Sequence, residues 1–200
     1  MTRILTTISM AALLAACTAS SDDMGAAGEN DTPTATEAGM NDGGTDAAMT
    51  DVSVCPDSQV IGLDDYPAEA LPTAENATEW LEQNAARDDI MVSATGMQHK
   101  VIQAGIENGV TPEAGENVTV HYHGYFPNGE VFDSSYARDT PITHTSNGFI
   151  KGWNQSLDQM SVCEARTLYV PADLAYGNSG AGGRPTGTLV FNMQLLSVNR

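Results

Sequence analysis

The stretch VTVHYHGYF, residues 118–126, carries a clear secondary-structure signal in this 200-residue chain. Apolar side chains occupy alternate positions, so one face of an extended segment holds Val118, Val120 and Tyr122. Threonine and histidine fill the other face, and this alternation predicts a β-strand. Ten of the twelve aromatic residues lie beyond Asn117, so we expect any pocket to be in that part of the chain.

Further strands are predicted on both sides of this one, within residues 91–93, 96–105, 166–170 and 188–198. The segment FIKGWNQSLDQM, 149–160, has a different period, because its apolar residues recur at helical spacing: Ile150, Trp153, Leu157 and Met160. This spacing predicts a short helix with one buried face. Many strands with one short core helix predict an α+β domain with an antiparallel sheet.

A second helix is predicted over about residues 76–87, in NATEWLEQNAARDD. Asn76 is a suitable N-cap, and Glu79, three residues later, is its reciprocal partner in a capping box. The buried face of this helix is expected to carry Trp80, Leu81 and Ala85. We assign the helix to an N-terminal extension, 51–96, that precedes the main domain, 97–200.

The first residues are typical of a targeting segment. Arg3 precedes an apolar run of 13 residues, 4–16, which is too short to span a bilayer because a spanning helix needs about 20 residues. The run ends in LAAC, similar to the lipobox of bacterial lipoproteins, which predicts a signal peptide, 1–16, and a lipid anchor at Cys17. An ordinary secretory signal with an incidental cysteine is the alternative. In bacterial lipoproteins an Asp directly after the cysteine favours retention at the inner membrane, and here the residue is Thr18. We therefore expect the protein to be anchored in a bacterial cell envelope, at the periplasmic face of the outer membrane.

Residues 17–50 are expected to form a disordered, acidic linker between the lipid anchor and the folded part. Residues 18–50 contain no aromatic residue and no Val, Ile or Leu, so they cannot bury enough apolar area to offset the entropy of ordering. The whole chain carries a net charge of −18. An acidic surface repels the phosphates of nucleic acids, so nucleic-acid binding is excluded as a function.

Two cysteines remain after Cys17, namely Cys55 and Cys163. In an oxidising compartment two thiols in one small protein tend to pair, and we predict a disulfide between them. Two unpaired, buried thiols are the alternative.

Several kinds of site are disfavoured by the motifs. His121 and His123 share one strand face, but no third metal ligand is spaced to join them, so we predict no metal site. The segment GNSGAGGRPTG, 177–187, lacks the Lys-Ser/Thr ending of a phosphate-binding loop and leads into a strand rather than a helix. We interpret it as a flexible loop.

Aromatic residues from separate predicted elements fit no single period: Tyr122, Phe132, Trp153, Tyr176 and Phe191. The segments that carry them are VTVHYHGYFPNGEVFDSS, FIKGW…QMSVCEA and PADLAYG…TLVFNMQLL. In order and spacing they resemble the FKBP-type peptidyl-prolyl cis-trans isomerases over roughly residues 97–198. The upstream segment 80–105 is similar to the region that joins helix and domain in the periplasmic, macrophage-infectivity-potentiator-like branch.

The resemblance implies an antiparallel half-barrel sheet around a short helix that begins near Lys151. It also implies a prolyl pocket, with catalytic positions at Tyr122, Phe132, Asp133, Trp153, Tyr176 and Phe191. Substrate-binding positions are implied at Arg138, Ile142, Phe149 and Ile150. Trp153 is then the pocket floor, Asp133 and Arg138 form an ion pair at the rim, and the Ile150 N–H and the Tyr176 hydroxyl bind the peptide.

The chain departs from the family pattern in places. Ile142 stands where an aromatic residue is usual, and Phe149 replaces a common Val. In the loop before the last strand, Gly183 aligns with an apolar residue of many members, so we expect one wall contact to be lost. Ser156 replaces a usual Gly in the short helix, a change that we expect to be tolerated.

The resulting hypothesis is a lipid-anchored peptidyl-prolyl cis-trans isomerase that needs no cofactor and acts on proline-containing unfolded or exported polypeptides. We expect a monomer, because only about 20 residues separate Cys55 from the helix at Asn76, too few for the long dimerising helix of some relatives. Two alternatives remain: a catalytically weak peptide-binding chaperone, and an envelope lipoprotein whose domain serves as an interaction module.

Overall fold

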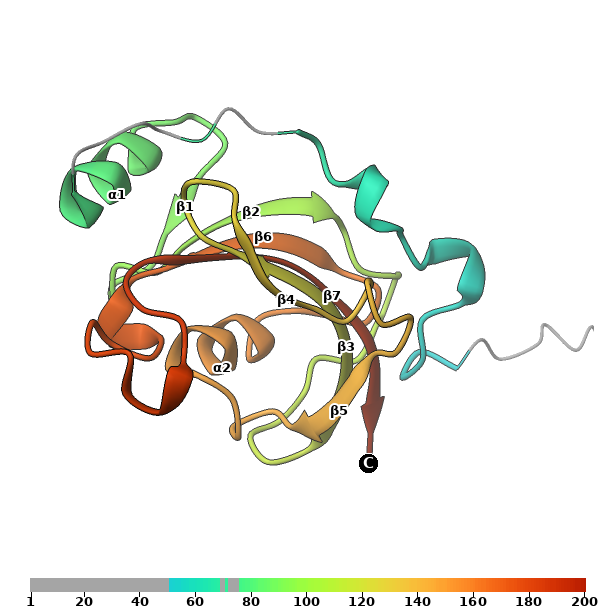
Figure 1. Ribbon diagram of the computed structural model, residues 1–200. Coiled ribbons are helices and arrows are strands. Elements are labelled where there is room, and N and C mark those ends of the chain that lie inside the picture. The colour runs from blue at the N-terminus through green and yellow to red at the C-terminus, as the bar shows by residue number, and fades with distance from the viewer. Residues whose placement is uncertain (1–50, 69–70, 72–75) are drawn as a thin grey trace, which may run out of the picture. The chain divides into compact units, whose positions relative to one another are not determined.

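A curved antiparallel sheet wraps around one short helix in the part of the chain that the structure describes (Figure 1). The structure is a computed structural model, and it describes residues 51–68, 71 and 76–200. The predicted signal peptide, 1–16, the predicted lipid anchor at Cys17 and the predicted linker, 17–50, lie outside these residues.

The sheet has seven strands: β1 Met91–Val92, β2 Gln98–Gln103, β3 Asn117–Tyr125, β4 Val131–Ser134, β5 Ile142–Thr145, β6 Ala165–Val170 and β7 Leu189–Asn199. The α-helices of the described part are α1 Ala77–Ala85 and α2 Lys151–Leu157, and its 3₁₀ turns are Asp57–Gln59, Leu63–Asp65, Ala172–Leu174 and Ala181–Gly183. None of these helices is long and apolar enough to cross a membrane.

Neighbouring strands run in the order β1-β2-β6-β7-β3-β4, and β5 also pairs with β3. Every pairing is antiparallel, which confirms the predicted α+β class. Along one edge, β3 pairs with β7 over its whole length. Its other edge is shared, because residues 117–120 pair with β5 and residues 123–125 pair with β4. This sharing brings two separate short strands to one side of the central strand.

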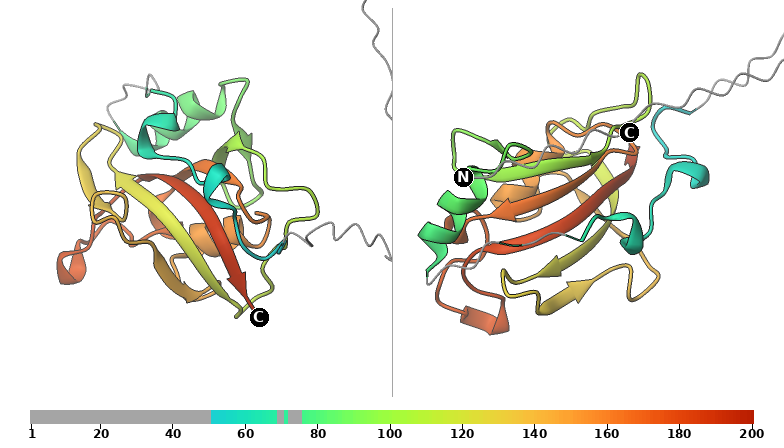
Figure 2. Two further views of the ribbon diagram at one scale, coloured as in Figure 1. Left: turned by 90° about the vertical axis from the view of Figure 1, so that its right-hand side faces the viewer. Right: turned by 90° about the horizontal axis from the view of Figure 1, so that it is seen from above.

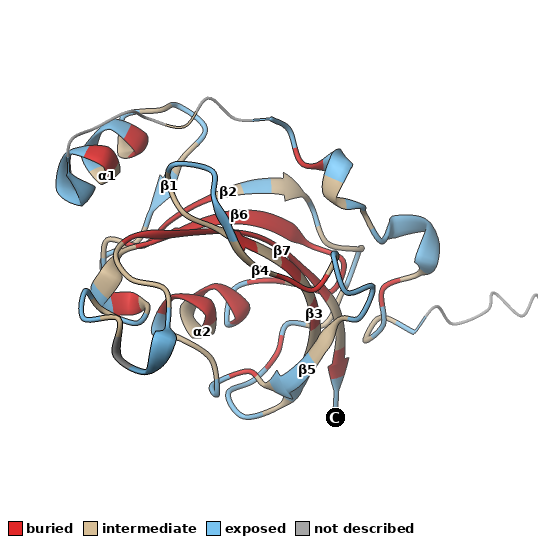
Figure 3. Cartoon of the chain, viewed as in Figure 1, coloured by how far each residue is buried: buried red, intermediate tan, exposed pale blue. Residues whose placement is uncertain are grey.

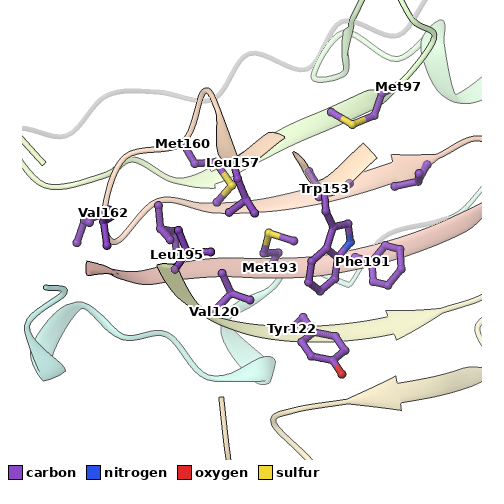
Figure 4. Packing of buried hydrophobic residues seen from close by; sticks show 14 of the residues in the cluster. Met97, Val120, Tyr122, Trp153, Leu157, Met160, Val162, Phe191, Met193 and Leu195 are labelled. Carbon is purple, nitrogen blue, oxygen red and sulfur yellow. The ribbon is translucent and has the colours of Figure 1, made fainter. Parts of the chain in front are cut away.

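Helix α2 lies inside the curve of the sheet, and its apolar stripe forms the centre of the core (Figure 4). Trp153, Leu157 and Met160 are buried, as the helical spacing predicted. They pack on the inward faces of β3 and β7, from which Figure 4 labels Val120, Tyr122, Phe191, Met193 and Leu195. Strands β6 and β7 are buried along most of their length (Figure 3).

Gly152 lets α2 approach β6 closely. A Cβ at this position would lie 2.5 Å from Val170 Cγ1, well inside van der Waals contact. A larger residue would push the helix away from the sheet, and with it the neighbouring Trp153.

Helix α1 packs on the opposite, outer face of the sheet. Trp80 is buried against Tyr169 of β6, with ring centroids 5.9 Å apart. Tyr169 lies between Leu168 and Val170, which belong to the inner core. Since successive strand residues point to opposite faces, α1 and α2 cover different sides of the same strand.

The N-terminus of α1 agrees with the sequence prediction, since the Asn76 side chain accepts a hydrogen bond from the Glu79 N–H at 3.0 Å. The predicted end near residue 87 is two residues too late. After Ala85 the chain tightens into a turn, in which the Arg87 N–H donates to the Asn84 carbonyl at 3.1 Å. The acidic pair that follows, Asp88 and Asp89, is unfavourable at a helix C-terminus because the helix dipole is negative there.

The predicted buried face of α1 is partly wrong. Trp80 is buried, but Leu81 and Ala85 are only half-buried, and Asn84 is fully buried instead. Asn84 lies one turn after Trp80 and donates to the Gln98 side chain at 2.8 Å. A buried amide is tolerated when it is hydrogen-bonded, and β2 supplies the partner.

Cys55 and Cys163 form a disulfide, as predicted. The bond fastens the segment 51–66 to the main domain beside the C-terminal half of β7 (Figure 2). Backbone hydrogen bonds accompany the bond, because the Cys55 N–H donates to the Leu196 carbonyl at 2.7 Å and the Val198 N–H donates to the Ser53 carbonyl at 2.9 Å.

Candidate active site

A cavity of about 520 Å³ opens between α2 and the β3–β4 edge of the sheet. Strand β3 and the neighbouring β4 and β5 supply one wall, and the start of α2 supplies the opposite side. The cavity is lined by Tyr122, Phe132, Asp133, Ile142, Gly148, Phe149, Ile150, Lys151, Trp153, Ala175, Tyr176, Arg184 and Phe191.

Nine of the ten residues expected at the pocket line this cavity. The exception is Arg138, which lies beside the wall and binds two residues that do line it, Asp133 and Tyr122. Its pair with Asp133 is the ion pair that the family resemblance implied.

Aromatic rings surround Trp153 at the base of the cavity. The rings of Tyr122, Phe149 and Phe191 each have their centroid 5.1 Å from that of Trp153. Tyr122 and Phe191 meet the indole edge-on, at 70° and 83°, an arrangement that aromatic quadrupoles favour. Figure 4 shows Tyr122, Trp153 and Phe191 next to one another on facing elements. Four large side chains thereby form a largely apolar base.

Gly124 makes room for the upper wall. A Cβ at this position of β3 would lie 2.7 Å from the Phe132 ring and 2.9 Å from the Phe191 ring. These two rings meet edge-on, with centroids 5.5 Å apart. Any side chain at Gly124 would displace them from the cavity wall.

One polar cluster interrupts the apolar lining. Asp133 accepts hydrogen bonds from the Tyr122 hydroxyl and from the Arg138 guanidinium, and Arg138 Nη2 also donates to Tyr122 Oη at 2.9 Å. Burial acts to raise the pKa of Asp133, but the hydrogen bonds from Tyr122 and Arg138 outweigh burial, so the pKa is lower than usual. The pKa of Tyr122 is raised mainly by burial and further by the hydrogen bond to Asp133. The cluster therefore holds an ionised carboxylate and a protonated phenol at neutral pH.

Among the hydrogen-bond donors at the cavity that have no acceptor in the described part of the chain are the backbone N–H of Ile150, which directly precedes α2, and the hydroxyl of Tyr176. The Tyr176 side chain is 39% exposed, so its hydroxyl is accessible to a ligand. Both groups can therefore bind the carbonyl oxygens of an extended peptide.

The loop before β7 is consistent with the expected loss of a wall contact at Gly183. Gly183 does not line the main cavity, and the neighbouring Arg184 does. The Arg184 guanidinium lies over the Tyr176 ring, 5.4 Å from its centroid. Four further lining residues were not predicted, because no periodic pattern identifies single residues in loops or at a helix start: Gly148, Lys151, Ala175 and Arg184.

His121 and His123 make protein contacts outside the cavity. His121 Nδ1 lies 2.9 Å from Ser135 Oγ, and its ring stacks on Tyr136 with centroids 4.5 Å apart. The ring of His123 lies beside Tyr125. Within residues 51–68, 71 and 76–200, no three His, Cys, Asp or Glu side chains are grouped as metal ligands would be.

We expect the free energy of unfolding to fall as the pH decreases from about 7 to about 5. Burial lowers the pKa of His99, His121 and His123 in the folded state, with Arg166 contributing at His99. The unfolded chain therefore takes up protons first, as the pH falls through about 6.5, and folding is disfavoured there. Urea unfolding at a series of pH values measures the slope. A His99→Gln variant should show a smaller slope, and a flat or rising profile toward low pH would contradict the assignment.

Comparisons with known proteins identify a family of similar chains. Residues 108–196 match the model of the family described as FKBP-type peptidyl-prolyl cis-trans isomerase. Peptidyl-prolyl cis-trans isomerase Mip of Coxiella burnetii is 40% identical over 129 residues, which cover 64% of this chain and 55% of that protein. Outer membrane protein MIP of Legionella longbeachae is 37% identical over 123 residues, which cover 60% of this chain and 52% of that protein. The chain thus spans about half the length of these relatives.

A solved structure provides a more complete match. The crystal structure of AtFKBP13 superposes with a TM-score of 0.50 and 32% sequence identity, over 55% of this chain and 98% of that one. Nearly all of AtFKBP13 thus has a counterpart in this chain.

Proposed function

The chain belongs to the FKBP-type peptidyl-prolyl cis-trans isomerases, and we propose that it catalyses cis–trans isomerisation of X–Pro bonds in polypeptides. The observation that carries the proposal is the cavity of about 520 Å³, which combines an aromatic base with two hydrogen-bond donors that have no acceptor in the described residues. In this proposal residues 97–200 are the isomerase domain and residues 51–96 are its extension.

The chemistry suits such a cavity. Rotation about an X–Pro bond faces a barrier of about 18–20 kcal/mol, because twisting removes the resonance of the planar amide. In water, hydrogen bonds to the carbonyl stabilise the planar, charge-separated form. Moving the imide onto the rings around Trp153 removes those hydrogen bonds. Contacts that fit the twisted amide better than the planar one then accelerate the reaction by about tenfold for each 1.4 kcal/mol.

Each part of the cavity has a role in this mechanism. Trp153 and its aromatic neighbours receive the proline ring. The Ile150 N–H and the Tyr176 hydroxyl hold the carbonyl groups on either side and so fix the peptide while the bond rotates. Asp133 and Arg138 act through Tyr122, whose orientation they hold, and the remaining contacts are supplied by Phe132, Ile142, Phe149 and Phe191.

The proposed setting is the bacterial cell envelope. The chain is similar to an outer membrane protein named MIP. Together with the predicted lipid anchor at Cys17, this similarity supports a protein that is tethered to the outer membrane and acts on exported, proline-containing polypeptides. The proposed monomer rests only on the short spacing between Cys55 and the helix at Asn76.

Isomerisation of short X–Pro peptides by the purified protein tests the activity. Replacing Tyr176 by phenylalanine should lower kcat/KM by about 3- to 10-fold, because one hydrogen bond is worth about 0.5–1.5 kcal/mol. A Tyr66→Phe variant is the control, since Tyr66 is a tyrosine outside the cavity whose hydroxyl lies 3.4 Å from that of Tyr136. If the folded wild-type protein shows no turnover above background but binds the peptides, the domain is a peptide-binding module instead.

A further inference from the structure

The basic side chains of the described part fall into two groups. Five form ion pairs with carboxylates: Arg87 and Lys100 with Asp89, Arg138 with Asp133, Arg166 with Glu164, and Arg200 with Glu116. Two, Lys151 and Arg184, form neither an ion pair nor a hydrogen bond through their side chains with any described residue. Both of these line the candidate active site.

A shortage of acidic partners does not explain the two free cations. The chain has 26 acidic residues and only 8 basic ones, so carboxylates are plentiful. Both residues are exposed and come from different structural elements. Lys151 begins α2, and Arg184 follows the 3₁₀ turn before β7. The only described carboxylate that lines the cavity is Asp133, which already binds Arg138 and the Tyr122 hydroxyl.

Arg184 also connects the cavity to a second hollow. This hollow, of about 510 Å³, shares four lining residues with the first: Phe132, Asp133, Tyr176 and Arg184. A polypeptide that crosses from one hollow to the other therefore passes the Arg184 guanidinium. A cation–π contact with the Tyr176 ring, whose centroid is 5.4 Å from the guanidinium carbon, favours this placement of the guanidinium.

We propose that the site prefers proline segments in which an aspartate or glutamate directly precedes the proline. This inference rests on the proposed isomerase function and names its substrate class. A guanidinium binds a carboxylate through two parallel hydrogen bonds, and its planar, pre-organised fork loses little freedom when it does so. Lys151 adds a second positive charge on the other side of the cavity. The residue before proline is nearest to the rotating bond, so its side chain lies at the cavity that both cations line.

The expected preference is moderate, because both cations are exposed and exposed ion pairs contribute only about 0.2–1 kcal/mol each. For the purified protein at low salt, we expect kcat/KM for a Glu–Pro peptide to exceed that for the matched Gln–Pro peptide by about 3- to 10-fold. The ratio should approach one at about 1 M salt, where the Debye length is about 3 Å.

Charge variants assign the preference to these residues. Arg184→Gln and Lys151→Gln should each lower the ratio of kcat/KM for Glu–Pro to that for Gln–Pro. Arg184→Glu should reverse the charge preference, so that a Lys–Pro peptide has a higher kcat/KM than the Glu–Pro peptide. Arg200→Gln is the matched control, because it removes one cation nine residues beyond Phe191 in sequence, or about 30 Å along an extended strand. This control should keep the wild-type ratio.

A Leu–Pro peptide separates the two proposals, since its turnover depends on isomerase activity and on no charge. If Leu–Pro is not turned over, the isomerase proposal fails. The preference is then decided by NMR titration, as the ratio of the association constant of Glu–Pro to that of Gln–Pro. A ratio of one or below at low salt, in either measurement, overturns the inference. So does a preference that survives both glutamine variants.

Discussion

Replacing Asp133 by alanine is expected to lower kcat/KM for X–Pro isomerisation by about 10- to 30-fold. The carboxylate holds the Tyr122 hydroxyl and the Arg138 guanidinium at one wall of the cavity. Hydrogen bonds to a charged group are worth about 1.5–3 kcal/mol, and we take the lower part of that range because the Asp133 side chain is 43% exposed. Without the carboxylate, the phenol loses the acceptor of its O–H, and only the bond from Arg138 still holds it.

The measurement is peptide isomerisation by the wild-type and variant proteins, each shown to be folded by circular dichroism. Glu107→Ala is the matched control, since it also removes one carboxylate but from an exposed side chain that makes no hydrogen bond or ion pair with another described residue. Activity of Asp133→Ala within twofold of that control would contradict the role given to the cluster.

A double-mutant cycle with Tyr122→Phe examines how Asp133 acts. If Asp133 works by orienting Tyr122, the loss in the double variant should be clearly smaller than the product of the two single losses. If the two losses multiply, the two side chains contribute independently, and the proposed positioning role of Asp133 is wrong.

Periodic segments were predictable because their signal is local. Alternation over residues 118–126 identified β3, and the three- and four-residue spacing from Ile150 to Met160 identified α2. In both elements, backbone geometry alone determines which side chains share a face, so the spacing of apolar residues predicts the buried face. The residues placed at the pocket came instead from the order and spacing of family motifs.

Features that depend on a distant partner were not predictable. Asn84 is buried because Gln98, on another element, accepts its hydrogen bond, and no property of α1 by itself indicates this. Arg184 reaches the cavity from a glycine-rich loop that has no period at all. In each case tertiary contacts, rather than local sequence, determine where a polar side chain lies.

Removing the disulfide is expected to lower the free energy of unfolding by about 2–5 kcal/mol. Cys55 and Cys163 are separated by 108 positions, and closing a loop of about 100 residues restricts the unfolded chain by about 4.7 kcal/mol in the chain-entropy model. Replacing both cysteines by alanine avoids burying an unpaired hydroxyl or thiol at these buried positions. Urea unfolding of this double variant and of the wild-type protein gives the difference.

The backbone at Cys163 allows the effect of the cross-link to be separated from local strain. Its φ is 71°, in the left-handed region that disfavours a side chain. A second variant, Cys55→Ala with Cys163→Gly, also lacks the disulfide but relieves that conformation, so it should be more stable than the double alanine variant by about 1 kcal/mol. Both variants should remain less stable than the oxidised wild-type protein, and a reducing agent should destabilise only the wild type. If the glycine variant matches the wild type, backbone strain rather than the cross-link determines the stability, and the expected disulfide contribution is wrong.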